Sequence, residues 1–223
     1  MKLILGNMNY SSWSIRGALV ARASGLDIPE EIVPLGFPET KQRLIAETGS
    51  HTVPVLKLGD LVIRDSVAIA ETLAERAKPG MVWPEDPDKR ALARSACAEM
   101  HSSFIGLRSQ MPVNIRSSLP TPTLEGDLLS DIERVKAIWG DLRSEFKSDG
   151  DYLLGAWSAA DAFYAPVVTR FRTYGYDLTG DLAAYSDAVW THPLMQTLRE
   201  QAEAEPWEIE VGHLGPIRAW MRE

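Results

Sequence analysis

The chain has 223 residues, which is enough for two compact domains of ordinary size. Its 31 acidic and 23 basic residues give a formal net charge of −8, and this excess of negative charge disfavours general binding to nucleic-acid phosphates or anionic lipid. The single cysteine, Cys97, excludes an intramolecular disulfide and a cysteine-rich zinc site. No apolar run approaches the roughly 20 residues that a membrane span needs. We therefore expect a cytoplasmic protein with no nucleic-acid and no membrane partner.

Strand-like and helix-like segments alternate through the first 78 residues in the order β-α-β-α-β-β-α. Residues 2–5 form a short apolar run typical of a strand, and a helix with Ile15 on its buried stripe follows. Residues 28–35 carry β-branched side chains interrupted by two prolines, which predicts a short strand. Residues 38–46 allow a helical turn or two.

A hairpin and a third helix complete this region. The apolar segments 53–58 and 61–63 flank the dipeptide Gly59-Asp60, which is typical of a tight turn between antiparallel strands. Ser66 then suits the N-cap position of a helix that Pro79-Gly80 ends.

Residues 79–87 contain three prolines and predict a linker between domains. Strand patterns stop there, and only helical patterns follow. The predicted division is an α+β domain of residues 1–78, a linker of residues 79–87 and an all-helical domain of residues 88–223.

Four helices are predicted in the all-helical region. Apolar side chains recur at steps of three or four from 88 to 111 and again from 128 to 146, which is the period of one helical face. A capping-box spacing at Ser158 predicts a third helix that reaches Tyr174. A fourth helix is expected after Pro193.

The turn between the first strand and the first helix carries two adjacent hydroxyls, Ser11 and Ser12. Backbone N–H groups at a helix start have no partner within the helix, and the helix dipole adds positive potential there, so an anion is stabilised. The ordinary interpretation is that one serine only caps the helix.

Two later segments also place backbone groups or a helix start where a ligand could bind. Val53-Pro54 opens a strand, and a cis bond before this proline turns the backbone groups of Val53 towards a ligand. Asp65-Ser66 starts another helix and gives a second N-terminus suited to an anion. Taken alone, each segment is also explained by an ordinary strand start or helix cap.

Together, the Ser-Ser-x-Ser turn, the Val-Pro strand start, the Asp-Ser helix start and the all-helical second half resemble the cytosolic glutathione transferase family. The first motif is most similar to the serine-type enzymes, including the zeta class, whose members isomerise maleylacetoacetate. The spacing between Ser11 and Arg16 agrees with that class. The resemblance implies an α+β thioredoxin-like amino-terminal domain followed by an all-α carboxyl-terminal domain. It also implies a homodimer that uses glutathione as co-substrate and needs no metal.

The resemblance assigns a catalytic hydroxyl to the first turn. Ser11 matches the family's serine that donates a hydrogen bond to the glutathione sulfur, and Ser12 is the alternate candidate. A free thiol has a pKa of about 8.5, and helix N-termini or cationic neighbours lower such values, so a hydroxyl at this place favours the thiolate.

The same resemblance implies where the rest of glutathione binds. Val53, ahead of Pro54, matches the residue that pairs main chain to main chain with the cysteinyl part, as in strand addition. Asp65 and Ser66 match the pair that holds the γ-glutamyl end. His51 or Thr52 is expected to reach the glycyl end.

The site for the second substrate is less clearly marked. Tyr10, Arg108 and Met111 are expected to line it if the first long helix packs beside the serine turn. An arginine there suits an acidic electrophile, and the alternative is a solvated surface charge. Met111 also belongs to the core stripe of the predicted helix.

Trp13 departs from the zeta pattern, because a cysteine usually follows the two serines in that class. The departure weakens the isomerase assignment and argues against related thiol oxidoreductases. We expect a glutathione transferase that adds glutathione thiolate to a small electrophile, as in detoxification. The alternatives are a glutathione-dependent cis-trans isomerase of the zeta kind and a noncatalytic glutathione-binding or scaffold protein with the same fold.

Overall fold

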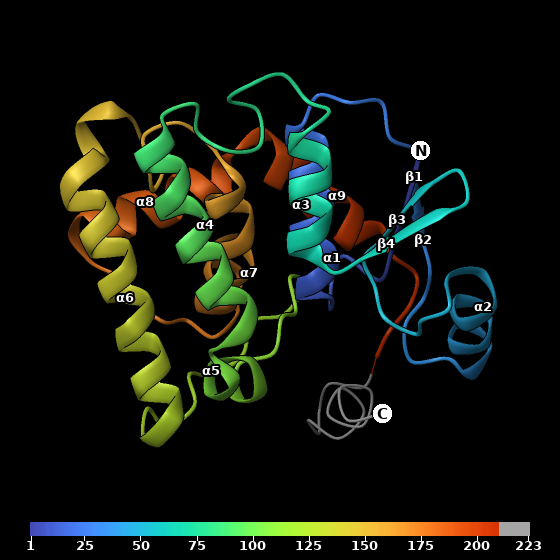
Figure 1. The fold of residues 1–223 in the computed structure, drawn as a ribbon. Coiled ribbons are helices and arrows are strands. Elements are labelled where there is room, and N and C mark those ends of the chain that lie inside the picture. The colour runs from blue at the N-terminus through green and yellow to red at the C-terminus, as the bar shows by residue number, and fades with distance from the viewer. Residues whose placement is uncertain (210–223) are drawn as a thin grey trace.

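Four strands form a mixed sheet in the computed structural model, which describes residues 1–209 (Figure 1). The strand order is β2-β1-β3-β4. The strands are β1 (Lys2–Leu5), β2 (Glu30–Ile32), β3 (Val55–Leu58) and β4 (Leu61–Arg64). β1 runs parallel to β2 and antiparallel to β3, and β3 pairs antiparallel with β4. The predicted hairpin around Gly59-Asp60 is confirmed.

The two faces of the sheet are buried against different helices, because successive side chains of a strand point to opposite faces. Leu3 and Leu5 belong to the core cluster that includes α1 (Ser12–Ala23) and α3 (Ser66–Ala74). Ile4 belongs to a second cluster with Leu44 of α2. In Figure 1, α2 accordingly lies on the opposite side of the sheet from α1 and α3.

Helix α2 (Pro38–Thr48) is longer than the turn or two predicted for residues 38–46. Pro38 occupies the first turn, where its missing N–H costs no helical hydrogen bond. Gly49 ends the helix at φ 68°, a left-handed conformation that favours glycine.

The remainder of the described chain is helical, as predicted. Its elements are α4 (Pro87–Ser102), α5 (Ile105–Gln110), α6 (Gly126–Phe146), the 3₁₀ turn η1 (Lys147–Asp149), α7 (Ala159–Thr173), α8 (Gly180–Thr191) and α9 (Pro193–Ala204). The capping box at Ser158 and the helix after Pro193 are confirmed. α8 was not predicted from the sequence. Residues 210–223 of the predicted helical domain lie outside the described residues.

The single helix predicted from 88 to 111 is wrong, because the chain breaks it into α4 and α5. Phe104 stands between them at φ 65° and ψ 41°. The break lets α5 pack on α6: the Leu107 N–H donates to Asp131 Oδ2 at 2.9 Å. Gly106 lies so close to Asp127 that an added Cβ would sit 2.6 Å from the Asp127 carbonyl carbon. A tertiary contact therefore decides where the helix ends.

One continuous core joins the sheet region to the helices. It reaches from Leu3 and Ile15 to Trp139, whose ring makes edge contacts with buried aromatic side chains of α7 and α8. Helix α1 packs against α7, which is buried along nearly its whole length. In the described part of the chain, no helix combines the length and apolar character that crossing a bilayer requires.

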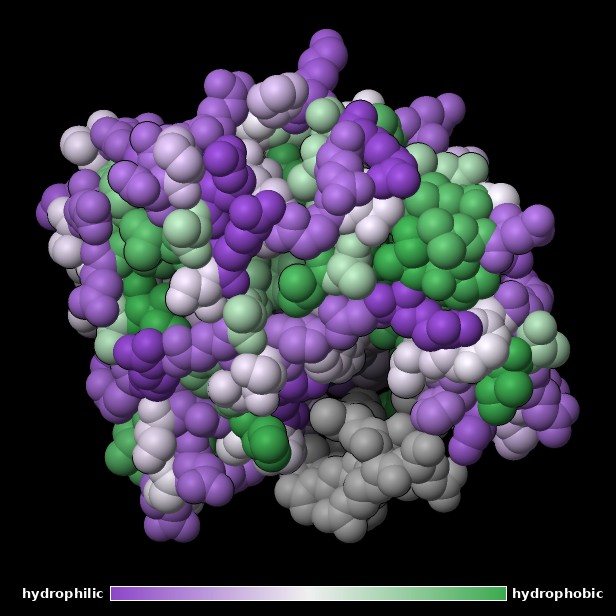
Figure 2. Space-filling model, in the orientation of Figure 1, coloured by the Kyte–Doolittle hydropathy of each residue, from purple (hydrophilic) through white to green (hydrophobic). Residues whose placement is uncertain are grey.

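Some apolar surface remains uncovered. Figure 2 shows a hydrophobic patch over the β3–β4 hairpin. Leu61 of the edge strand β4 is 58% exposed there. An edge strand with an exposed apolar side chain is a feature that proteins usually protect by pairing or by covering it.

Candidate active site

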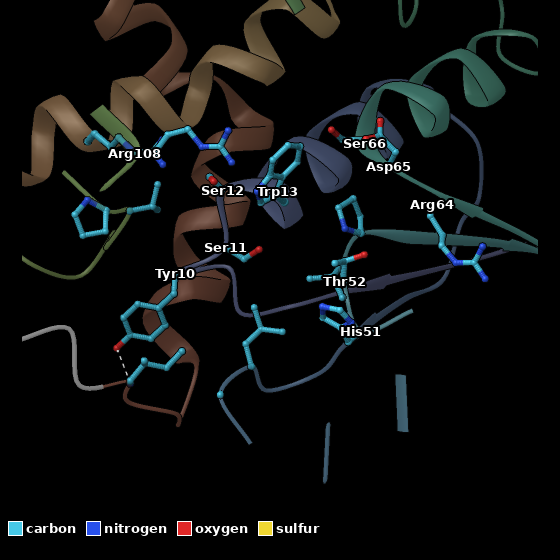
Figure 3. Close-up of a pocket in the computed structure, with 18 residues that line it drawn as sticks. Tyr10, Ser11, Ser12, Trp13, His51, Thr52, Arg64, Asp65, Ser66 and Arg108 are labelled. Carbon is cyan, nitrogen blue, oxygen red and sulfur yellow. Dashed lines mark hydrogen bonds between the residues drawn. The ribbon is translucent and has the colours of Figure 1, made fainter. Parts of the chain in front are cut away.

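A pocket of about 490 Å³ lies where the sheet region meets the helices (Figure 3). Nearly all of the predicted site residues line it, although they come from four separate segments. They are Tyr10, Ser11, Ser12, His51, Thr52, Val53, Pro54, Asp65, Ser66 and Arg108. The fold therefore brings together the three motifs that the sequence analysis singled out.

Met111 is the exception among the predicted site residues. Its side chain is fully buried in the core, and it is absent from the pocket wall. Its carbonyl accepts a hydrogen bond from Arg170 Nε at 2.8 Å. The expectation that Met111 contacts a second substrate is corrected: its apolar side chain follows the core stripe, and the neighbouring Pro112 and Val113 line the pocket instead.

The two serines of the first turn have different surroundings. Ser11 is the N-cap of α1: its Oγ accepts from the Ser14 N–H at 3.1 Å and donates to Ser14 Oγ at 2.9 Å. Ser14 Oγ also accepts from the Gly6 N–H at 2.7 Å. The Ser12 hydroxyl forms no hydrogen bond with any residue of the described range 1–209. Both serines lie on the pocket wall. Of the two, Ser12 is the one whose hydroxyl is available to hydrogen-bond a ligand.

Val53 offers its backbone to the pocket. The bond between Val53 and Pro54 is cis, as the sequence analysis considered. Neither the N–H nor the C=O of Val53 is hydrogen-bonded to a described residue. Buried backbone groups normally have partners, so a ligand strand is the fitting complement here.

Asp65 is held tightly at the start of α3. It takes φ 80°, an uncommon conformation for a residue with a side chain, and its Oδ1 accepts from the Val67 N–H at 2.8 Å. Its Oδ2 lies 3.1 Å from His101 Nε2 of α4. Beside it, the Ser66 Oγ is buried and has no partner within residues 1–209. The pair thus presents a fixed carboxylate next to an unsatisfied hydroxyl.

His101 was missed from the sequence. Its imidazole also makes an edge contact with the Trp13 ring, with centroids 5.0 Å apart. It therefore links the first turn of α1 to the carboxylate at the start of α3. No local motif marks His101, because both contacts are made between segments far apart in the chain.

The segment after α9 closes one side of the pocket. The Tyr10 hydroxyl accepts from Arg116 Nη2 at 3.1 Å and from the Ile209 N–H at 3.3 Å. Glu205 accepts from the Met8 N–H at 2.5 Å. Ile209 itself lines the pocket. Sequence reasoning missed these contacts, since they join segments that lie far apart in the chain.

The first helix also buries a cation. Arg16 is completely inaccessible, and its guanidinium carbon lies 4.8 Å from the centre of the Trp13 ring. Burial, followed by repulsion from Arg108, lowers the pKa of Arg16 to about 9. Contact with the faces of aromatic rings offsets part of this cost.

Metal-binding side chains are not gathered anywhere in the described range. Across residues 1–209 there is no group of three His, Cys, Asp or Glu side chains that suits a metal ion. The pocket instead offers hydroxyls, free backbone groups and arginines.

Comparison with known proteins shows which family the chain belongs to. The model of the glutathione S-transferase amino-terminal domain matches residues 5–80, and the model of the carboxyl-terminal domain matches residues 130–223. The chain belongs to the glutathione transferase family. As a glutathione S-transferase it is an enzyme whose activity depends on glutathione.

Several relatives resemble this transferase. Rat maleylacetoacetate isomerase (Rattus norvegicus) is 28% identical over 171 residues, which are 75% of this chain and 76% of the rat protein. A glutathione transferase homologue from Burkholderia, solved with bound glutathione, has a TM-score of 0.67 and 24% identity over 92% of this chain and 98% of that chain. A bacterial zeta-class maleyl pyruvate isomerase has a TM-score of 0.66 and 21% identity over 94% and 100% of the two chains. The fold predicted for the transferase is confirmed.

Proposed function

We propose that this transferase holds glutathione in the pocket, stabilises its thiolate and adds the sulfur to a small electrophile. The observation that carries this proposal is the free Ser12 hydroxyl at the start of α1, where unpaired N–H groups and the helix dipole also favour an anion. Holding the two reactants in one pocket removes much of the entropic barrier to their reaction.

Three groups support a single orientation of glutathione. The free backbone of Val53 suits the cysteinyl peptide, and the buried Ser66 hydroxyl suits the γ-glutamyl carboxylate. Asp65 accepts the ammonium group. His51 and Thr52 then face the glycyl end (Figure 3).

Ser12, and not Ser11, is the proposed donor to the sulfur. The Ser11 proton is already donated to Ser14 Oγ, and its lone pair caps α1, so Ser11 has a structural task. Ser12 has no competing partner among the described residues. Ser12 can therefore donate to the thiolate without breaking a hydrogen bond of the protein.

Paired alanine substitutions test this assignment with glutathione and a chlorodinitrobenzene. Ser12→Ala should lower kcat by about 10²-fold, as loss of one preorganised donor to an anion typically does, and change the Kd for glutathione little. It should also raise the pKa of the bound thiol, measured by the ultraviolet absorbance of the thiolate. Ser11→Ala should instead lower stability by about 1 kcal/mol, as loss of an N-cap does.

Ser130→Ala, at an exposed position on α6, is the matched control and should behave as the unchanged enzyme. If Ser11→Ala abolishes thiolate formation while Ser12→Ala does not, the two roles are reversed.

A second candidate function is glutathione-dependent isomerisation, which the similarity to rat maleylacetoacetate isomerase favours. Turnover of maleylacetone without turnover of a chlorodinitrobenzene supports it. Retention on immobilised glutathione without turnover of any electrophile supports the noncatalytic alternative.

We further propose a cytoplasmic homodimer that acts in detoxification, with its two domains divided within residues 79–87. The hydrophobic patch at the β3–β4 hairpin, with Leu61 exposed on an edge strand, supports association of two copies. Sedimentation of the purified protein tests the dimer.

A further inference from the structure

His101, in the last turn of α4, contacts the carboxylate at the start of α3. Its Nε2 lies 3.1 Å from Asp65 Oδ2, and its ring meets the Trp13 ring edge-on, with 82° between the two planes. Asp65 and Trp13 line the pocket, whereas His101 is absent from the pocket wall. The imidazole therefore acts on a bound ligand through Asp65.

The surroundings of the imidazole assign the position of its proton. Nδ1 is buried and has no hydrogen-bond partner within residues 1–209. A neutral imidazole has one N–H and one lone pair, so the N–H belongs on Nε2, where it donates to Asp65 Oδ2. A second proton would lie on Nδ1, where the described residues offer no acceptor.

Asp65 remains able to receive a ligand. Its Oδ1 accepts from the Val67 N–H at 2.8 Å and from the Ala68 N–H at 3.4 Å, and its side chain is still 44% exposed. Figure 3 shows it beside Ser66 at the start of α3. In the proposed orientation, Ser66 receives the γ-glutamyl carboxylate and Asp65 receives the adjacent ammonium group. This ammonium group and the imidazole of His101 therefore share one carboxylate.

We propose that His101 is a positioning residue for glutathione: when neutral it holds Asp65 for the ammonium group, and when protonated it competes with that group. The inference rests on the proposed function and adds a residue to its glutathione site. A neutral N–H donor leaves the negative charge of Asp65 for the ligand, whereas an imidazolium pairs with that charge. Histidine is the side chain that ordinarily changes charge between about pH 5 and 8. Glutathione should therefore bind more weakly as the pH falls, and the ammonium group should be the part that is affected.

Other charged groups near the imidazole keep one charge in this range. Arg16 of α1 and Arg108 of α5 lie against Trp13, with guanidinium carbons 4.8 and 4.7 Å from the centre of its ring, and arginine stays cationic at neutral and acid pH. Burial raises the pKa of Cys97 on α4 and of Tyr164 on α7, so both stay uncharged. Two ion pairs join α4 to α3 and α6, namely Arg94 with Glu71 and Arg134 with Glu99.

Two further groups could change overall binding with pH. Burial raises the pKa of Asp161 to about 6, and its carboxylate accepts from the N–H groups of Leu153 and Ser158. His51 lines the pocket where the glycyl end is proposed to bind. Neither group contacts Asp65, so neither should distinguish a ligand that has the ammonium group from one that lacks it.

Two ligands that differ only in the ammonium group test the proposal. S-methylglutathione has this group, and S-methyl-N-glutarylcysteinylglycine carries a hydrogen in its place; neither has a thiol that can ionise. The charges of both ligands are constant between about pH 5.5 and 7.5. Calorimetry gives the two Kd values, and their ratio measures the preference for the ammonium group. In the unchanged enzyme this preference should fall about fivefold from the higher to the lower pH, as expected for coupling between two bound cations.

His101→Gln shows where the pH dependence arises. Glutamine keeps an N–H that donates to Asp65 and carries no charge, so the preference at the higher pH should be retained and should no longer fall in acid. His192→Gln is the matched control, because His192 stacks on Trp157 and caps α9 through Nδ1, away from the pocket wall. It should keep the full fivefold change, as should Asp161→Asn.

Each other outcome is decisive. A preference that is independent of pH in the unchanged enzyme overturns the role of His101 and leaves the transferase function intact. Equal Kd values for the two ligands at the higher pH also overturn it, because the ammonium group then does not bind at Asp65. Retention of the full change in His101→Gln assigns the effect to another group and overturns it as well. Failure of both ligands to bind, together with failure to turn over a chlorodinitrobenzene, overturns the proposed function itself.

Discussion

The carboxylate of Asp161 is completely buried at the start of α7. Oδ1 accepts from the Leu153 N–H at 3.0 Å, and Oδ2 accepts from the Ser158 N–H at 2.8 Å and from Ser158 Oγ at 3.2 Å. Burial opposes ionisation more strongly than these hydrogen bonds favour it, and it raises the pKa of Asp161 to about 6. The residue therefore ties a loop to a helix start at an electrostatic cost.

Comparison of the unchanged protein with Asp161→Asn should expose this cost. A carboxyl whose folded pKa lies above its unfolded value holds its proton more tightly in the folded state. Its contribution to stability is therefore complete below about pH 4 and is lost as the pH rises through about 6, by up to about 3 kcal/mol. Urea unfolding at acid and neutral pH measures the difference between the two proteins. If the unchanged protein instead gains stability relative to Asp161→Asn as the pH rises, the hydrogen bonds outweigh burial and the pKa of Asp161 is lowered.

At the scale of elements, the short helix α5 fixes the position of Arg108. Gly106 permits α5 to approach α6, since an added Cβ would lie 2.6 Å from the backbone of Asp127. Asp131 of α6 accepts from the Leu107 N–H and so caps α5 from outside. Arg108, which lines the pocket, is therefore positioned by a contact between helices.

Gly106→Ala should push α5 away from α6. We expect a loss of roughly 1–3 kcal/mol in the free energy of unfolding, as overpacking usually costs. Because Arg108 lines the pocket and moves with α5, the KM for the electrophile should rise while the KM for glutathione changes little. Steady-state kinetics with each substrate varied in turn measures both.

Gly140→Ala in the interior of α6 is the matched control. A Cβ at Gly140 meets no heavy atom within 4 Å, so the substitution should stabilise the helix by about 0.5–1 kcal/mol. Equal kinetics of Gly106→Ala and Gly140→Ala would show that the α5–α6 contact does not position Arg108.

Most elements could be predicted from local pattern. A hairpin turn, a capping box and an apolar stripe are each encoded within a few residues. The turn at Gly59-Asp60 marked two strands, and the capping box at Ser158 marked the start of a helix. The end of α4 could not be predicted, because the apolar period continues through Phe104 and only packing on α6 interrupts it. α8 was missed because its segment carries no clear apolar stripe in the sequence.

At the scale of the whole molecule, Glu205 joins the two ends of the described chain. Its carboxylate accepts from the N–H groups of Met8 and Asn9, at 2.5 and 3.2 Å. Arg116 Nη1 in turn donates to the Glu205 carbonyl at 2.8 Å. The loop that leads to the Ser11-Ser12 turn is therefore held by the segment that follows α9.

Glu205→Gln should destabilise the protein and reduce glutathione binding. An amide presents one acceptor oxygen, so one of the two N–H groups loses its partner, at a cost of roughly 1–3 kcal/mol. Urea unfolding and the KM for glutathione measure the two effects. Glu203→Gln, two residues earlier and exposed, is the control and should change neither. An unchanged unfolding midpoint for Glu205→Gln would mean that the carboxylate does not hold the loop.

The candidate site also contains residues that could be predicted from the sequence and residues that could not. Ser11, Ser12, Val53 and Asp65-Ser66 could be predicted because each stands at the end of a strand or helix, where its local sequence reveals its position. His101, Arg116, Ile209 and the core position of Met111 depend on how distant segments pack, and one sequence carries no direct signal of that. The family resemblance indicated the position of residues only for the half of the pocket where glutathione is proposed to bind.

Cys97, the single cysteine of the chain, is buried in the core. Cys97 of α4 is 1% exposed, and burial raises the pKa of its thiol well above the ordinary value. Thiol-directed alkylating agents attack thiolates and need access to them, so such reagents find no cysteine to modify on the folded enzyme. The electrophiles proposed as its substrates therefore cannot inactivate this transferase through its own thiol.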